Sequence, residues 1–116
     1  MDFIRTEKND VVVIKVNLNR ATLKEAEDFK INLTSELRSG KEKLVVDLSE
    51  CEFIDSTFLG TLVVTLKKVT SNGGDLRLVG FKSAVRSMFE LTRMYRVFET
   101  FPTSDEAVKS FSEAGG

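Results

Sequence analysis

Short apolar runs alternate with segments of helical period along this chain, and this alternation restricts its possible folds most strongly. Leu44–Leu48 has the length and composition of a strand that is buried on both faces, as the central strands of parallel sheets are. Segments with apolar residues at helical spacing precede it and follow it. Such a strand-helix-strand unit needs a right-handed crossover, which packs the helix against the sheet. The sequence therefore predicts a single α/β domain over residues 1–116.

The other segments complete a predicted order of β-β-α-β-α-β-α-β-α. A β-branched run at residues 11–14, after the turn-forming residues 8–10, predicts a hairpin at the start of the chain. The predicted sheet is mixed but mostly parallel, with about five strands and about four helices. The strands are expected near residues 3–6, 11–14, 44–48, 76–79 and 97–101, and the helices near residues 22–39, 56–72, 85–92 and beyond Thr103.

Polar residues mark the start of the first predicted helix. Thr22 and Glu25 match a capping box, in which each side chain binds a free backbone N–H group of the first turn. Gly40 is placed to end the helix. The boundaries are therefore expected near residues 22 and 39.

The composition argues against several classes of function. The 17 basic and 18 acidic residues give a net charge of −1, so the chain has no excess positive field for a nucleic-acid backbone. It contains no histidine, which is the commonest metal ligand and general base. Its single cysteine, Cys51, excludes an internal disulfide. We therefore expect no enzyme activity, no metal site, no cofactor and no nucleic-acid partner.

The distribution of apolar residues indicates where the protein works. No apolar stretch reaches the ~18 residues that a membrane-spanning helix needs. The first five residues lack the basic-then-apolar layout of a signal peptide. We expect a cytoplasmic protein without membrane insertion.

The strongest functional signal lies in the segment Phe53–Gly60. Its residues Asp55, Ser56 and Thr57 stand where the second helix must begin. In one interpretation they are helix caps, because Asp and Ser oxygens accept the unpaired N–H groups of the first turn. In the other, a hydroxyl at an exposed helix N-terminus accepts a phosphate, which the free N–H groups and the helix dipole help to hold. Phosphorylation there would switch binding and would not make a catalytic centre.

Four segments also match the pattern of one family in order. Leu44–Leu48 is a strand that ends in Asp-Leu, and Asp55–Gly60 stands where the family has Asp-Ser-[Ser/Thr]-Gly-Leu-Gly. Asn72–Leu78 and Val85–Thr92 match the next strand and the third helix. Together, over about residues 10–112, they resemble STAS domains, especially the bacterial anti-sigma factor antagonists.

The resemblance implies a mechanism known as partner switching. In the antagonists, the first Ser after the Asp is phosphorylated by a partner that is both an anti-sigma factor and a serine kinase. Only the unphosphorylated antagonist binds this partner and frees the sigma factor, and a serine phosphatase restores the binding form. By this match Ser56 is the phosphoacceptor and Thr57 the second choice. The expected partner-binding residues are Asn19, Asp55, Ser56, Thr57, Phe58 and Thr61.

Two positions depart from the family pattern. Phe58 replaces the usual Gly, and on helical spacing it shares a face with Thr61, Thr65 and Lys68, away from the apolar stripe. We expect either an exposed aromatic anchor for a partner or a ring that packs under a neighbouring loop. Asn19 replaces a loop acid, which keeps an acceptor oxygen but loses a charge that would steer a basic partner.

Two alternatives to a phosphorylation switch remain open. Phe58 motivates a non-switching STAS scaffold, or an accessory subunit of a stress-signalling assembly or a lipid-transport complex. A phosphotransfer enzyme or receiver that uses Asp55 as acceptor would need a magnesium-binding carboxylate cluster, whereas Asp47 and Asp55 are the only acids at strand ends near the motif.

Overall fold

The computed structural model describes residues 1–114 and confirms an α/β fold built on a five-stranded mixed sheet. The strand order is β1-β2-β4-β6-β7, in which β1 is antiparallel to β2 and the other neighbouring strands are parallel. The strands are β1 (Phe3–Lys8), β2 (Val11–Val16), β4 (Lys43–Asp47), β6 (Asp75–Val79) and β7 (Thr100–Phe101). The helices are α1 (Leu23–Arg38), α2 (Ser56–Ser71), α3 (Ser83–Leu91) and α4 (Ser104–Ala114).

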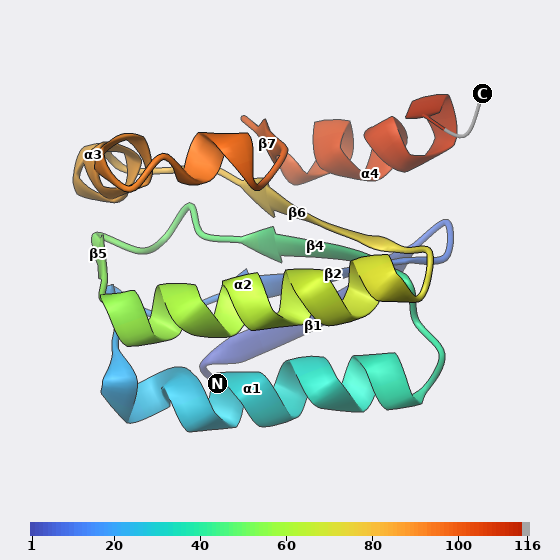
Figure 1. The fold of residues 1–116 in the computed structure, drawn as a ribbon, viewed down its shortest axis with the longest axis horizontal. Helices are drawn as coiled ribbons and strands as arrows, with labels where there is room; N and C mark the ends of the chain where they lie inside the picture. The colour runs from blue at the N-terminus through green and yellow to red at the C-terminus, as the bar shows by residue number, and fades with distance from the viewer. Residues whose placement is uncertain (115–116) are drawn as a thin grey trace.

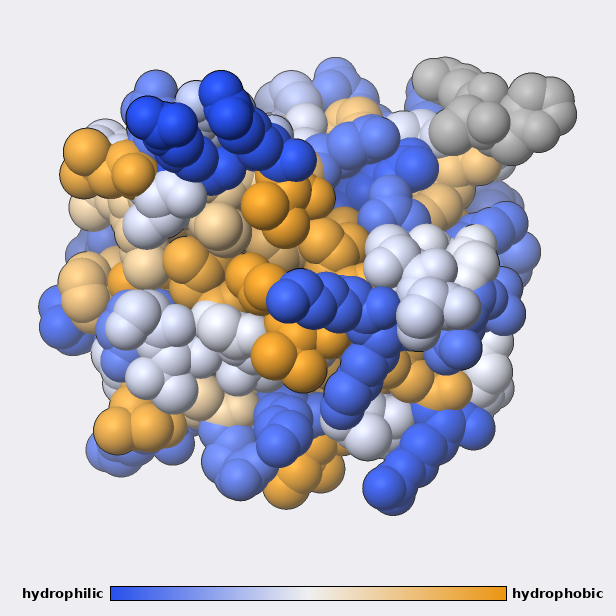
Figure 2. Space-filling view, viewed as in Figure 1, coloured by the Kyte–Doolittle hydropathy of each residue, from blue (hydrophilic) through white to orange (hydrophobic). Residues whose placement is uncertain are grey.

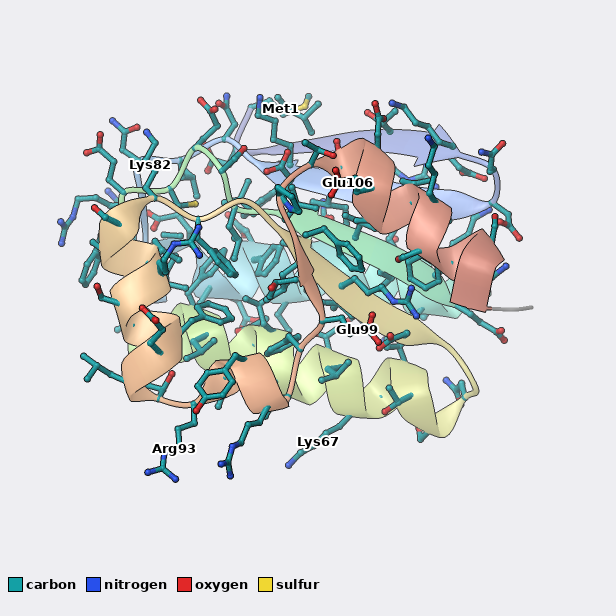
Figure 3. All side chains as sticks on the ribbon, turned by 90° about the horizontal axis from the view of Figure 1, so that it is seen from above. Met1, Lys67, Lys82, Arg93, Glu99 and Glu106 are labelled. Atoms are coloured by element: carbon teal, nitrogen blue, oxygen red, sulfur yellow. The ribbon has the colours of Figure 1, made fainter. Side chains whose placement is uncertain are left out.

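The helices cover the two faces of the sheet unequally (Figure 1). α1 and α2 lie side by side on one face, and α3 packs against the same core through Val85 and Phe89. α4 covers the opposite face. Seen from above, α4 lies over the strands and α2 runs along one side of the sheet (Figure 3). Alternate residues of each strand point to opposite faces, so every central strand contributes to two cores.

The start and end of α1 agree with the sequence prediction. Thr22 is the N-cap, its hydroxyl accepts the Lys24 N–H group at 3.3 Å, and Glu25 completes the capping box by accepting the Thr22 N–H group at 2.9 Å. The helix ends at Arg38, and Gly40 follows with a φ of +82°. Only glycine adopts such a backbone conformation without strain.

Two local elements were not predicted. A 3-10 helix, η1, spans Met94–Arg96, and a two-stranded parallel pair joins β3 (Arg20–Ala21) to β5 (Phe53–Ile54). η1 also shortens the last strand, which was expected to start at Val97. The Phe98 N–H group donates to the Met94 carbonyl at 3.0 Å, so residues 97 and 98 belong to the turn and not to the sheet.

Candidate partner-binding site

The pairing of β3 with β5 brings together residues that are far apart in the chain. Ala21 pairs with Ile54, and the Ala21 carbonyl accepts the Asp55 N–H group at 3.1 Å. The start of α2 is therefore held beside the start of α1, at the end of the molecule where Figure 1 labels β5. Ser56 is the first residue of α2 and lies at this junction.

Asp55 caps both helices with one carboxylate. Its Oδ1 accepts the Phe58 N–H group at 2.9 Å, which caps α2, and its Oδ2 accepts the Leu23 N–H group at 2.8 Å, which is the first N–H group of α1. The capping interpretation is therefore confirmed for Asp55. A carboxylate with both oxygens bonded to backbone N–H groups holds the loop in one conformation.

The two hydroxyl residues after Asp55 face the solvent. Ser56 and Thr57 are both exposed, and their side chains form no hydrogen bond with any side chain or backbone group described for residues 1–112. Thr61 lies one turn further along α2, is half-buried, and donates its hydroxyl to the Thr57 carbonyl at 3.3 Å. The first turn of α2 thus presents two free hydroxyl groups on a fixed backbone.

Phe58 is buried, and the interpretation as an exposed anchor is wrong. Its side chain is 0% exposed and stacks on Phe29 of α1, with ring centroids 4.4 Å apart and an interplanar angle of 7°. Phe29 stacks in turn on Phe3 at 5.1 Å. The ring packs against a helix and not under a loop. A fully buried ring offers no surface to a partner in this conformation, and it leaves Ser56 exposed.

The packing of α1 explains this correction. Helical spacing assigned Phe58 and Thr65 to a face away from the core, which is correct if the sheet alone covers α2. Here α1 covers a second side of α2, so Thr65 is also buried, at 5% exposure, and its hydroxyl donates to the Thr61 carbonyl at 2.8 Å. The predicted stripe is confirmed at Leu59, Leu62, Leu66 and Val69, which are buried.

Asn19 lies next to the site through its backbone. Its carbonyl accepts the N–H groups of Glu52 at 2.7 Å and Phe53 at 3.1 Å, just before β5 leads into Asp55. Its side chain is exposed. The structure therefore brings Asn19, Asp55, Ser56, Thr57 and Thr61 to one end of the molecule, whereas partner contact by these residues remains a prediction.

Arg20 and Phe53 are also at this end, and the sequence analysis did not single them out. The Arg20 guanidinium carbon lies 4.4 Å from the centroid of the Phe53 ring, and both side chains are exposed. The only signal was the position of Arg20 directly after Asn19, because a two-residue strand leaves no periodic pattern.

A strip of hydrophobic surface continues from the site along the same side of the molecule. Figure 2 shows it between α2 and η1, crossed and flanked by hydrophilic side chains. Val97, which follows η1, is 43% exposed. Exposed apolar surface with a polar rim is typical of protein interaction sites.

The remaining reactive groups near the site serve the fold. Burial raises the pKa of the Cys51 thiol to about 12, and the negative charges of Asp47 and Glu50 act in the same direction. The buried thiol therefore stays protonated at neutral pH and is a poor nucleophile. An Asp47 carboxylate oxygen accepts the Ser49 N–H group at 2.9 Å.

Two further observations concern metals and membranes. Among the described side chains of residues 1–112, no three of Asp, Glu or Cys gather closely enough to hold a metal ion. In the same part of the chain, no helix combines the length and the apolar character needed to cross a bilayer.

Comparison with known proteins places this geometry in a family. The model of the STAS domain matches residues 4–107, and the chain belongs to the STAS domain family. Among its relatives is a Thermotoga maritima protein provisionally assigned as an anti-sigma factor antagonist. It is 33% identical over 102 residues, which are 87% of this chain and 89% of the relative. Its crystal structure superposes with a TM-score of 0.85 at 32% identity, covering 93% of this chain and 92% of that chain.

Two further proteins resemble the chain, one in sequence and one in fold. The anti-sigma-B factor antagonist of Staphylococcus aureus is 33% identical over 60 residues, which are 52% of this chain and 56% of that protein. The Bacillus cell fate determinant SpoIIAA, solved in a phosphorylated form, has a TM-score of 0.73 over 94% of this chain and 98% of its own. At 15% identity, that likeness shows the fold alone. The chain is thus a STAS domain of the anti-sigma factor antagonist family.

Proposed function

We propose that this protein is an anti-sigma factor antagonist that is switched by phosphorylation of Ser56. In its unmodified form it binds an anti-sigma factor that is also a serine kinase, and the sigma factor is released. The kinase then transfers the γ-phosphoryl group of ATP to the Ser56 Oγ, so that an O–P bond forms, the hydroxyl proton is lost and ADP leaves. A serine phosphatase restores the binding form.

One observation carries this proposal: Ser56 is an exposed hydroxyl residue at the first position of α2, in the place of the family's acceptor. Asp55 fixes the loop through its two hydrogen bonds, and the inward Phe58 leaves room for a kinase. The SpoIIAA structure, which has the same fold and was solved in a phosphorylated form, supports the view that this fold accommodates a phosphate.

The charge of a phosphate explains the switching. Phosphorylation adds roughly −1.5 to −2 charges to Ser56, directly beside the Asp55 carboxylate. A partner surface that accepts the neutral hydroxyl group then meets two neighbouring anions. Binding is lost through desolvation and repulsion and needs no change of fold.

The test is intact-mass analysis with site mapping after incubation with the cognate kinase and ATP. The wild type is expected to gain one phosphate on Ser56, and S56A to gain none. T57A is the matched control, because Thr57 is the neighbouring exposed hydroxyl and should be dispensable. Phosphate that maps to Thr57, or persists in S56A, contradicts the assignment of Ser56.

The alternative is a non-switching STAS scaffold or an accessory subunit of a larger assembly. This alternative was suggested by the bulky Phe58 in the acceptor loop, which could block a kinase. The ring is buried against Phe29, so it does not obstruct access to Ser56. The two functions differ in their response to charge at position 56. S56D should abolish partner binding by a switch and leave binding by a scaffold unchanged.

The proposed mechanism also determines location and chemistry. An antagonist that competes for an anti-sigma factor works in the cytoplasm, where its partner and the phosphatase act. It acts as a binding protein, while the kinase and the phosphatase supply the catalysis. Nucleic acid and membrane have no part in this cycle.

A further inference from the structure

Arg20 is held above the protein surface by an aromatic ring. It lies on β3 opposite Phe53 of β5, and its guanidinium carbon is 4.4 Å from the ring centroid. Phe53 itself is 38% exposed. A guanidinium that stacks on a ring uses its flat face, which leaves its N–H edges free for another acceptor.

The backbone under this pair is fixed. The Asn19 carbonyl accepts two N–H groups, from Glu52 and Phe53, and the Ala21 carbonyl accepts that of Asp55. Arg20 therefore stands between two anchored residues on a strand that leads directly to the acceptor loop. A side chain held in this way loses little conformational freedom when it binds, so its contacts contribute more to affinity.

The carboxylates near Arg20 are engaged elsewhere. Glu52 lies 3.8 Å from the Lys82 ammonium, and Asp55 uses both oxygens as helix caps. Among the side chains of residues 1–112, which the structure describes, Arg20 forms no ion pair. Figure 3 shows Lys82 at the start of α3, with its side chain directed away from the sheet. The exposed cation thus stacks on Phe53 but has no acidic partner in the described part of the chain.

The neighbouring position adds to this charge pattern. Asn19 is neutral and exposed, so residues 17–20, from the loop into the first residue of β3, carry one cation and no acid. A loop of this charge repels a basic partner surface and attracts an acidic one. The planar fork of a guanidinium matches a carboxylate in a bidentate geometry.

We propose that the stacked Arg20–Phe53 pair is a specificity contact for an acidic partner surface. It would bind a carboxylate of the serine-kinase anti-sigma factor, beside the place where Ser56 enters the kinase. This inference rests on the proposed function. It goes further by specifying that the partner surface facing Arg20 is negatively charged. Exposed Arg and aromatic residues are enriched among those that dominate interfaces.

Association kinetics with the cognate kinase test this inference. We expect R20E to lower the association rate constant about five-fold at low salt, and R20Q to lower it less, because rim charges act mainly on association. The difference from wild type should shrink at high salt, where screening is strong. R38E is the matched control. It makes the same charge change in the last turn of α1, at the far end of that helix from β3, and should leave the rate nearly unchanged.

A second variant tests the aromatic support. F53L keeps Arg20 but removes the ring that holds it, so it should reproduce part of the R20Q effect. Circular dichroism of each variant checks that the fold is kept.

The outcomes separate the two proposals. If wild type binds and R20E associates equally fast or faster, the acidic-face inference is overturned while the antagonist function stands. If R20E and R38E slow association equally, the effect is one of net charge, and the specific contact is again overturned. If wild type binds no serine-kinase anti-sigma factor at all, both proposals fail together.

Discussion

The two faces of the central sheet are covered in different ways. On the face of α1 and α2, 22 buried apolar residues among those described form one cluster, which includes the stacked Phe29 and Phe58. On the opposite face, six such residues form the contact between the sheet and α4, and two of them, Ala107 and Val108, belong to α4 itself. Arg77 of β6 is buried there as well, at 7% exposure. Each face also buries a charged side chain, since Glu36 of α1 is 8% exposed and pairs with Arg5 at 2.7 Å. The faces differ in the apolar cluster around that side chain, which is large beside Glu36 and small beside Arg77.

The difference shows where this fold gains its stability. Burial of apolar area contributes roughly 25 cal/mol per Å², so the larger cluster supplies most of the driving force. The smaller cluster adds directional contacts. The Arg77 Nε donates to an Asp75 carboxylate oxygen at 3.0 Å, its Nη1 donates to the Ser110 hydroxyl, and its guanidinium lies 4.1 Å from the Phe111 ring centroid. These contacts fix the position of α4 on the sheet.

The largest effect is expected from opening the α1–α2 core. F58A should lower the free energy of unfolding by about 3–5 kcal/mol, because it removes a fully buried ring and leaves a cavity against Phe29. Urea denaturation monitored by circular dichroism measures the change. F58L, which fills much of the same volume, is the control and should cost less. A loss below about 1 kcal/mol for F58A would show that the core collapses around the site.

A smaller effect is expected from the opposite face. R77A should lower the free energy of unfolding by about 2 kcal/mol, since it removes charge-assisted hydrogen bonds and the stacking on Phe111. R77M also leaves Asp75 without its cation, but it keeps the apolar stem packed beside Phe111 and avoids a cavity, so it should cost less than R77A. If R77A costs more than F58A in the same urea experiment, the proposed ranking of the two faces is reversed.

The smallest effect is expected from the cap that joins α1 to α2. D55A should cost about 1.5 kcal/mol of unfolding free energy, because two helices lose one acceptor each. D55N should cost about half as much, since its amide oxygen can still accept one N–H group but its amide nitrogen cannot accept the other. Thermal denaturation compares both with T22A, which removes only the cap that belongs to α1. Equal losses for D55A and D55N would contradict the double cap.

The sequence predicted the sheet and the α1 and α2 boundaries because those signals are local. The capping box at Thr22 and the glycine at position 40 each act within a few residues. The strand that ends at Asp47 was likewise visible as one apolar run. Interactions between residues close together in the chain can be predicted from the sequence alone.

The features that were missed depend on contacts between distant residues. The burial of Phe58 follows from a second helix beside α2, which the period of one helix does not reveal. The β3–β5 pair joins residues 20–21 to residues 53–54, and two residues are too few for a strand pattern. Arg20 gains its fixed position only through this pair. The sequence therefore predicted the residues of the Asp55–Thr57 motif in the candidate surface, but not Arg20 and Phe53 beside them.

The carboxylate of Asp55 also links two events in folding. It bonds to N–H groups of Leu23 and Phe58, which are 35 positions apart in the chain, so neither first turn has its full set of bonds until the other is in place. The N-terminal turns of α1 and α2 consequently open and close as one cooperative unit. Slow hydrogen exchange at Leu23 and at Phe58 then reports the same opening, and the acceptor loop is only as mobile as that shared unit.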